Sequence, residues 1–486
     1  MPLPVVPVPS AYERHLMNRV GWGWSRATYA DLRRAGGGKA WLARQLRPGT
    51  LKEPARARAV AGPWFPDLAD SPQRRWQRHQ DGSKDGWRYA VDLANQSLMR
   101  RMYSRRQLLE TMVDFWSDHL HVPGGHDSAW LFRSQYDDLL RRHALGRFDT
   151  LLAAATLHPA MVLHLDTWTS TRQRPNENHG RELLELHTVG RSAGYTEEMV
   201  VDSARILSGY TMDAWWTWTP RYDPERHATG PVQVLGFRHD NAAADGQAVA
   251  AAYLRYLAHH PATARTIARK LALRFVSDNP SAALVDRLAK TFRASGTDMT
   301  ATLKVLFASR EFRRAAGRKV RTPDQDLVAT VRALDVRARA PRSRESFANC
   351  LTWVQPGMRL FDWPRPDGPP QTAQAWSSVT RVMGSYRMHW NLAGGWYPRA
   401  DVQHRPQRYW LPARRIPRRG LPLPAYVDRL ARLTLGRPAT ALERRAVVQA
   451  TGFPATTRVT PDHALARWDR VRVLGVLLDS PTHMTR

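Results

Sequence analysis

The spacing of apolar residues between Trp87 and Leu120 limits the fold of this chain more than any other feature. Apolar side chains recur there at intervals of three and four residues, the period of an α-helix with one buried face. The clearest run consists of Leu108, Leu109, Met112, Val113, Phe115, Trp116 and Leu120. Comparable patterns predict helices at 128–143, 147–157, 160–168, 197–208, 246–258, 262–274, 281–294, 299–308 and 324–335. The sequence therefore predicts a mainly α-helical fold with a large multi-helix body.

One segment has the pattern of strands instead. Trp215–Thr219 and Val232–Phe237 are rich in aromatic and β-branched residues, and they flank a loop that contains proline and glycine. Two such runs around a loop predict a β-hairpin. We expect this hairpin to be a small insertion that projects from the helical body.

Irregular composition divides the rest of the chain. Residues 48–86 are rich in Pro, Arg, Asp and Gly and have no steady hydrophobic period, which predicts an irregular connection. The expected organisation is N-terminal helices at 1–47, the connection at 48–86, a helical core at 87–335 with the hairpin insertion at 213–240, and a Pro/Trp-rich region with C-terminal helices at 336–486.

The composition excludes several classes of protein. Apolar residues make up 43% of the 486 residues, which is ample for a buried core. No apolar run approaches the roughly 18 residues of a membrane-spanning helix, so no transmembrane segment is expected. The only cysteine, Cys350, excludes an intrachain disulfide and a multi-thiolate metal site. The first ten residues have prolines and no basic segment, unlike a signal peptide, and a cytoplasmic location is the corresponding expectation.

The formal net charge of +30 raises the question of a polyanionic partner. The basic residues are 66 arginines and only seven lysines, spread over the whole chain. Such a bias is typical of the codon usage of a GC-rich genome. An acidic polymer or a glycan stays open as a partner, whereas nucleic-acid binding is the weaker alternative.

The stretch Asn176–Gly190 is the strongest candidate for chemistry. It predicts a helix in which Glu182 and Glu185 lie three residues apart on one stripe, with apolar residues on more than one other side. Buried carboxylates need a cation or a proton as partner. Either Glu177, Arg181 and Glu185 form a ladder of ion pairs, or Glu182 and Glu185 bind one metal ion.

Histidines are concentrated in the same part of the chain. Eight of the 18 lie between residues 119 and 187, namely His119, His121, His126, His143, His158, His164, His179 and His187. Imidazole and carboxylate together are ligands for zinc, manganese or iron. His119 and His121, at the end of the helix predicted at 105–121, are the expected imidazole ligands, although each is equally consistent with a core or loop histidine.

These residues lead to a functional hypothesis. We expect a metal-dependent enzyme, redox or hydrolytic, with a divalent ion (Zn, Mn or Fe) between helices 105–121 and 177–190. Glu182 and Glu185 are expected as ligands or as an acid/base pair, and Arg181 as the group that orients an anionic substrate. The alternative is a non-catalytic binding or scaffold protein for a glycan or a partner protein.

Six segments, in one order, resemble the bacterial family catalogued as domain of unknown function 1800. They are Leu108–Leu120, Asn176–Gly190, Gly194–Glu197, His260–Leu271, Arg274–Asp278 and Phe361–Gly368. The resemblance implies a large, mostly helical protein. It also implies a sulfatase- or phosphatase-like protein encoded nearby as a partner, and an extracytoplasmic location, because many similar proteins carry export signals. It implies no catalytic residue.

Overall fold

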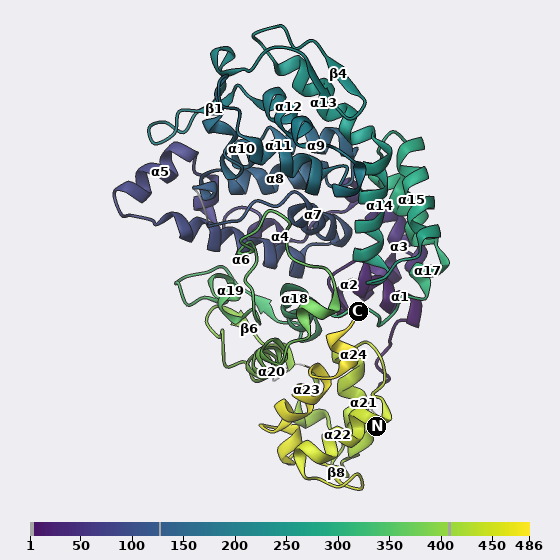
Figure 1. Ribbon diagram of the computed structural model, residues 1–486. Coiled ribbons are helices and arrows are strands. Elements are labelled where there is room, and N and C mark those ends of the chain that lie inside the picture. Colours follow the sequence, from purple (N-terminus) through teal and green to yellow (C-terminus); the bar gives the residue numbers. More distant parts are fainter. Residues whose placement is uncertain (1–3, 126–127, 407–409) are drawn as a thin grey trace.

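The computed structural model describes residues 4–125, 128–406 and 410–486, and this part of the chain is mainly α-helical, as predicted (Figure 1). Its strands form only four two-stranded antiparallel sheets. No helix among the described residues is both long and apolar enough to cross a membrane. His126 lies outside the described residues.

Most helices follow one another with short connections, whereas longer segments separate α12 from α13, α19 from α20 and α20 from α21. The first five are α1 (Ala11–Arg19), α2 (Arg26–Arg34), α3 (Gly38–Gln45), α4 (Ala55–Val60) and α5 (Pro72–Gln80). The main body contains α6 (Gly86–Tyr103), α7 (Gln107–His119), α8 (Arg133–His143), α9 (Phe148–Thr156), α10 (Pro159–His164), α11 (Glu177–Glu182), α12 (Glu197–Leu207), α13 (Gln247–His259), α14 (Pro261–Phe275), α15 (Ala282–Ala294), α16 (Met299–Ala308), α17 (Arg310–Arg313) and α18 (Pro323–Ala333). The last six are α19 (Leu351–Val354), α20 (Val379–Gly394), α21 (Leu423–Thr434), α22 (Ala441–Thr451), α23 (Arg470–Leu478) and α24 (Pro481–Met484).

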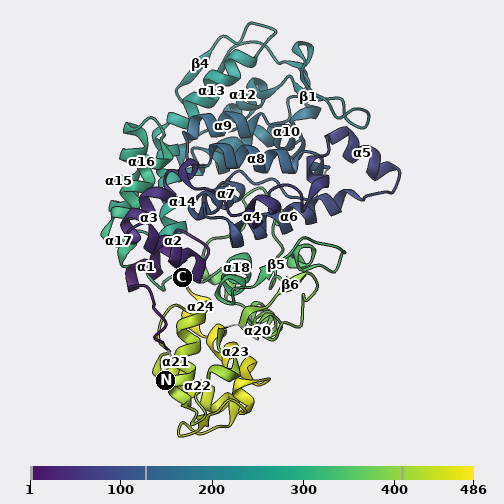
Figure 2. The same ribbon diagram turned by 180° about the vertical axis from the view of Figure 1, so that it is seen from behind.

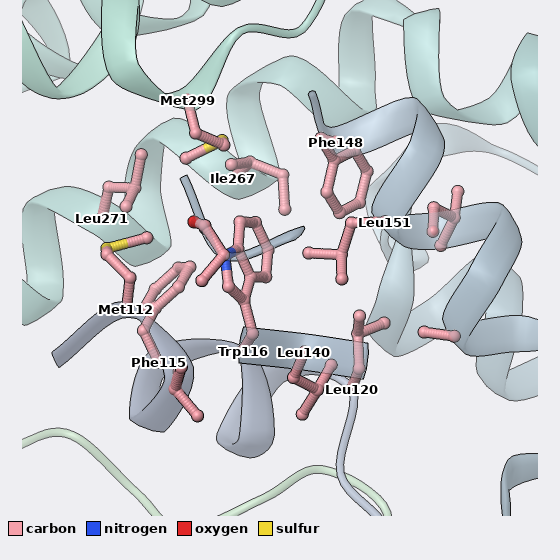
Figure 3. Close-up of a cluster of buried hydrophobic side chains, with 14 of the residues drawn as sticks. Met112, Phe115, Trp116, Leu120, Leu140, Phe148, Leu151, Ile267, Leu271 and Met299 are labelled. Carbon is pink, nitrogen blue, oxygen red and sulfur yellow. Dashed lines mark hydrogen bonds between the residues drawn. The ribbon is translucent and has the colours of Figure 1, made fainter. Parts of the chain in front are cut away.

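Helix α7 lies at the centre of the largest core. Figure 3 shows its Met112, Phe115 and Trp116 meeting side chains from α8, α9, α14 and α16. Burial of each such side chain contributes about 1.5–3 kcal/mol relative to exposure. The Trp116 indole N–H donates to the carbonyl oxygen of Ala144 at 2.9 Å, so this buried donor is paired. This core holds the end of α7 rigidly, with α1–α3 and α14–α17 together on one side of the molecule (Figure 2).

The described residues form two further large cores and a small cluster of Leu93, Ala94 and Phe361. One joins α6, α18 and α20, and the other joins α21, α22 and α23 at the end of the molecule away from the hairpins (Figure 1). The chain returns from this end to the centre, because the backbone of Arg486 pairs with that of Lys319. The C-terminal helices are therefore connected to the main body by α18, α20 and the last residues.

The β-hairpin segment differs from the prediction in detail. It forms two hairpins, of β1 (Tyr210–Met212) with β2 (Pro220–Tyr222) and of β3 (Val232–Val234) with β4 (Phe237–His239). The predicted strand Trp215–Thr219 is instead the turn between β1 and β2. Trp215 and Trp218 have φ of 72° and 54°, which a strand does not allow, and both rings pack on Trp76 of α5. Aromatic packing in the turn outweighs the strand preference of these residues.

Many arginine side chains are buried and form hydrogen bonds within the protein. Ten arginines of the described residues are buried, and most donate to backbone carbonyl groups of neighbouring segments. Arg75, for example, donates to the carbonyl oxygens of Leu131 at 2.6 Å and Leu68 at 2.7 Å. The planar guanidinium, with five donors, suits this role. Part of the positive charge is therefore internal rather than available to a polyanion.

Candidate active site beside helix α7

A pocket of about 250 Å³ lies where α7 ends against α14. Its polar walls are Asp118, His119, Lys270, Arg365, Asp367 and Gln371. Three of the six segments that carry the family resemblance supply all of these residues except Gln371, although they are far apart in the sequence. The tertiary fold thus brings together at one pocket segments that the sequence presents separately.

The pocket is covered by residues 361–372, called here the covering segment. In Figure 1 this green segment runs from the region of α18 to α7. His121 donates from Nε2 to the carbonyl oxygen of Trp363 at 2.8 Å. The side-chain amide of Gln371 donates to Oδ2 of Asp118, also at 2.8 Å. These bonds fix the covering segment to the end of α7, and His121 contributes one of them.

Gly368 is the point of closest approach between the covering segment and α7. Its φ is 71°, and a Cβ atom built there would lie 2.0 Å from the backbone oxygen of Asp118. We expect Gly368→Ala to lower the free energy of unfolding by about 3 kcal/mol, through left-handed strain and a backbone clash. Gly317→Ala is the matched control, since Gly317 has φ of 72° but open space, so only the cost of about 1 kcal/mol for φ remains. Denaturant titration measures both, and equal losses would contradict the close contact.

Lys270 of α14 is the unusual group in the pocket wall. Its Nζ lies 2.7 Å from Nδ1 of His119 and 3.2 Å from the carbonyl oxygen of Leu186. Within the described residues no carboxylate lies within ion-pair distance of it. Burial lowers the pKa of Lys270 to about 8, so a substantial fraction of the amine is neutral near pH 7.5.

His119 holds the amine of Lys270 in place. Its buried ring donates from Nε2 to the carbonyl oxygen of His187 at 3.1 Å, which leaves the unprotonated Nδ1 as an acceptor for Lys270. Burial, and next the charge of Lys270, keeps the pKa of His119 well below its usual value. The ring is therefore a neutral acceptor of one defined tautomer.

The carbonyl groups that accept from His119 and Lys270 come from an unusual turn. Residues Leu183–His187 form a π-helix directly after α11. A π-helix is wider than an α-helix and is frequent at functional sites. At the end of a helix the last carbonyl groups have no partner within the helix. Here those of Leu186 and His187 turn to Lys270 and His119.

Asp118 is the acid of the pocket. Burial, and next the negative charge of Asp114, raises the pKa of Asp118 well above its usual value. Asp118 therefore holds its proton to a higher pH than an ordinary aspartate, and in that form it can donate the proton. An amine with a lowered pKa beside a carboxyl group with a raised pKa is an arrangement that active sites use for proton transfer.

In the structure, the charged residues of the stretch 177–190 form ion pairs, mostly with residues outside this stretch. Arg181 pairs with Glu197 at 2.6 Å and with Glu177 at 3.3 Å, and Glu185 pairs with Arg191 at 2.6 Å. Glu182 is half-buried, and burial followed by the charge of Glu185 raises its pKa. The π-helical turn has more residues per turn than an α-helix, so Glu182 and Glu185 are not stacked on one α-helical face.

The four predicted ligands do not come together as one set in the described residues. Glu182 is the last residue of α11 and Glu185 lies in the π-helix after it, whereas His119 binds Lys270 and His121 binds the covering segment. Neither Glu182 nor Glu185 belongs to any described group of three His, Cys, Asp or Glu side chains close enough to hold an ion. The charge of Asp367 nevertheless contributes to the raised pKa of Glu182, so Glu182 and the covering segment interact electrostatically.

Two other histidines near His119 are fully buried. The rings of His119 and His187 lie 6.3 Å apart between centroids. Neither ring nitrogen of His187, nor Nε2 of His179, has a hydrogen-bond partner in the described residues. Burial lowers the pKa of His179 to about 3, so its ring is neutral. Unpaired buried nitrogens of this kind are available to a metal ion or a small polar ligand.

Sequence reasoning missed a second buried group, which could hold a metal ion: Asp326, His389 and His483. His389 lies 3.1 Å from Asp326 and 2.7 Å from Asp479, one carboxylate at each ring nitrogen. Burial alone would lower the pKa of His389, but these two carboxylates raise it to about 9. Both ring nitrogens then carry protons, so this group acts as an ion pair at neutral pH. Asp326 and His389 are 63 residues apart in the chain, and no local pattern signals them.

Comparison with known proteins supports the family assignment and no other relationship. No curated protein and no solved structure matches the chain. A family model described as "Protein of unknown function (DUF1800)" matches residues 15–485, which is nearly the whole length and includes every wall of the pocket. The chain therefore belongs to the DUF1800 family of proteins of unknown function.

Proposed function

We propose that this protein is an enzyme that transfers protons to and from a small substrate in the pocket between α7, α14 and the covering segment. Lys270 is the base, Asp118 is the acid, and His119 positions the amine. The observation that carries the proposal is the amine of Lys270, which contacts two neutral acceptors and no carboxylate in the described residues. A lysine that serves only structure is normally paired with a carboxylate when it is buried.

Lys319 of the same protein illustrates the structural alternative. It is buried and its pKa is also lowered, to about 8, by burial, yet its amine contacts the carboxylate of Asp278. Lys319 also donates to the carbonyl oxygen of Gln371, so it anchors the covering segment. The two lysines have similar pKa values but different partners, and only Lys270 is in the wall of the pocket.

A metal-dependent enzyme, redox or hydrolytic, is the second candidate. The unpaired ring nitrogens of His179 and His187 favour it, because neutral imidazoles are good ligands for zinc and iron. Burial raises the pKa of Glu182, and Glu185 pairs with Arg191. In such an enzyme these two carboxyl groups would act from the side of the covering segment. Metal analysis of the purified protein tests this candidate, and less than about a tenth of an ion per chain would contradict it.

Proton transfer can be tested without knowing the substrate. The protein is incubated in D₂O with a panel of small aldehydes, ketones, esters and carboxylates, and deuterium uptake at carbon is followed by mass spectrometry. We expect at least one compound to exchange about 10²–10⁴-fold faster than in buffer. The rate should rise with pH up to about 8, where Lys270 becomes neutral.

Two variants make this test specific. Lys270→Met is expected to abolish the exchange, whereas Lys290→Met, at an exposed lysine of α15, should leave it unchanged. A panel in which every compound exchanges at the buffer rate would contradict the proposal. Compounds that stabilise the protein against heat without any exchange would instead support the non-catalytic binding protein.

A further inference from the structure

We propose that Lys270 is a nucleophile that forms an imine with the carbonyl carbon of a small aldehyde or ketone. This inference rests on the proposed function and names its substrate class. A neutral amine has two N–H groups and one lone pair. His119 Nδ1 and the carbonyl oxygen of Leu186 accept from Nζ at 2.7 and 3.2 Å, which uses both N–H groups. The lone pair is then left for the pocket that Lys270 lines.

Desolvation of the Lys270 amine favours its neutral form and outweighs the charges of Asp118 and Asp367, which favour the ammonium form. Both acceptors are uncharged, and no described carboxylate lies within ion-pair distance of Nζ, so no direct ion pair stabilises an ammonium group. Partly buried lysines with desolvated amines are the ones that react with carbonyl compounds, since the neutral amine is the nucleophile. The volume of about 250 Å³ is near the lower end for ligand pockets, which suits a small carbonyl compound.

The neighbouring groups balance the reaction. The lone pair of Nζ attacks the carbonyl carbon, a C–N bond forms, and the carbonyl oxygen takes the proton of Asp118. The nitrogen passes one proton to Nδ1 of His119, which already accepts a hydrogen bond from it. His119 then returns this proton to the hydroxyl group, which leaves as water while the C=N bond forms. The products are a protonated imine on Lys270, water and the Asp118 carboxylate, with no oxidant or reductant required.

Charge is conserved within the pocket by this sequence. The protonated imine formed on loss of water carries one positive charge, and the Asp118 carboxylate formed during the addition step carries one negative charge. His119 ends neutral, with its Nε2 still donating to His187. The raised pKa of Asp118 and the lowered pKa of Lys270 both shift these groups toward the state before the reaction, with neutral acid and neutral amine.

Reductive trapping tests the inference on the whole protein. Wild-type protein at pH 7.5 is incubated with glyceraldehyde or pyruvate and sodium cyanoborohydride, and modified lysines are mapped by peptide mass spectrometry. The chain has only seven lysines, so every site can be quantified. At this pH about a quarter of an amine with a pKa near 8 is neutral, against roughly a thousandth of an ordinary lysine. We expect Lys270 to be modified at least tenfold faster than exposed Lys290.

Lys319 is the internal control for reactivity caused by burial alone. It has a similar pKa but is paired with Asp278, so we expect it to stay unmodified. His119→Gln should slow trapping at Lys270 at least tenfold, whereas Lys290→Arg should leave it unchanged. The inference would be overturned if the rate of modification followed the solvent exposure of each lysine, so that Lys270 reacted no faster than Lys290. In that case deuterium exchange that still depends on Lys270 would leave the proton-transfer function intact, and its absence would overturn both.

Discussion

Replacing Asp114 by asparagine is expected to lower the free energy of unfolding by about 3–5 kcal/mol. Asp114 lies in the middle of α7 and accepts from Arg101 at 2.8 Å and from Arg274 at 2.6 Å. The side chains of Arg101 and Arg274 are only 3% and 2% exposed, so water cannot replace the lost carboxylate. The variant keeps the shape of the side chain but leaves buried guanidinium groups without their shared anion.

The two arginines would not lose their partners equally. Arg101 keeps Asp324 at 2.6 Å, whereas Arg274 keeps only the amide oxygen of Gln371 at 3.2 Å. We therefore expect the region of α14 and the covering segment to loosen first. Thermal unfolding measures the loss as a fall of several degrees in Tm. Asp138→Asn is the matched control, since the Asp138 side chain is 63% exposed, and a loss no larger than its ±0.5 kcal/mol would contradict the prediction.

Replacing Asp326 by asparagine is expected to cost about 3–5 kcal/mol at pH 6 and clearly less at pH 10. Asp326 is fully buried in α18, where His389, Arg381 and Ser385 bind its two oxygens. Together with Asp479 it links α18, α20 and the end of α23. Removing its charge leaves the protonated ring of His389 with only one carboxylate.

The pH dependence follows from the pKa of His389. Its folded-state pKa of about 9 lies above the unfolded value of 6.5, so its contribution is complete below pH 6.5 and is lost as pH rises through 9. A shift of this size corresponds to about 3 kcal/mol. The measurement is the difference in unfolding free energy between wild type and Asp326→Asn from pH 6 to 10, with Asp286→Asn at a half-exposed site as control. A difference that stays constant with pH, or that disappears after metal chelation, would contradict the ion pair.

The helical fold was predictable because helix formation leaves a local pattern. The period of three and four residues around Met112 and Trp116 identified α7, and the same α7 is the centre of the core. The strands were less predictable. Trp215–Thr219 has the composition of a strand, yet contacts with Trp76 on a distant helix make it a turn. The composition of one segment carries no information about a contact with a distant part of the chain.

The candidate site was predictable only in part. Functional residues were predicted from the sequence at the end of α7 and around Glu182. In the structure, His119 at the end of α7 lies in the wall of the pocket. Lys270 was not recognised, because it lies in an ordinary amphipathic helix, and the family segment His260–Leu271 that contains it implies no catalytic residue. Arg365 and Asp367 belong to a loop whose position against α7 depends on Gly368 and Gln371.

The residues alone were enough to establish the class of fold and the family. The evidence was the hydrophobic period, the single cysteine and the six family segments. Which side chains meet was decided by packing over long distances in the chain. Burial beside neutral acceptors sets the charge of Lys270, and burial beside carboxylates sets that of His389, so two titratable groups shift in opposite directions. Such shifts depend on solvent exclusion and on neighbours from other helices, and these exist only once the chain has folded.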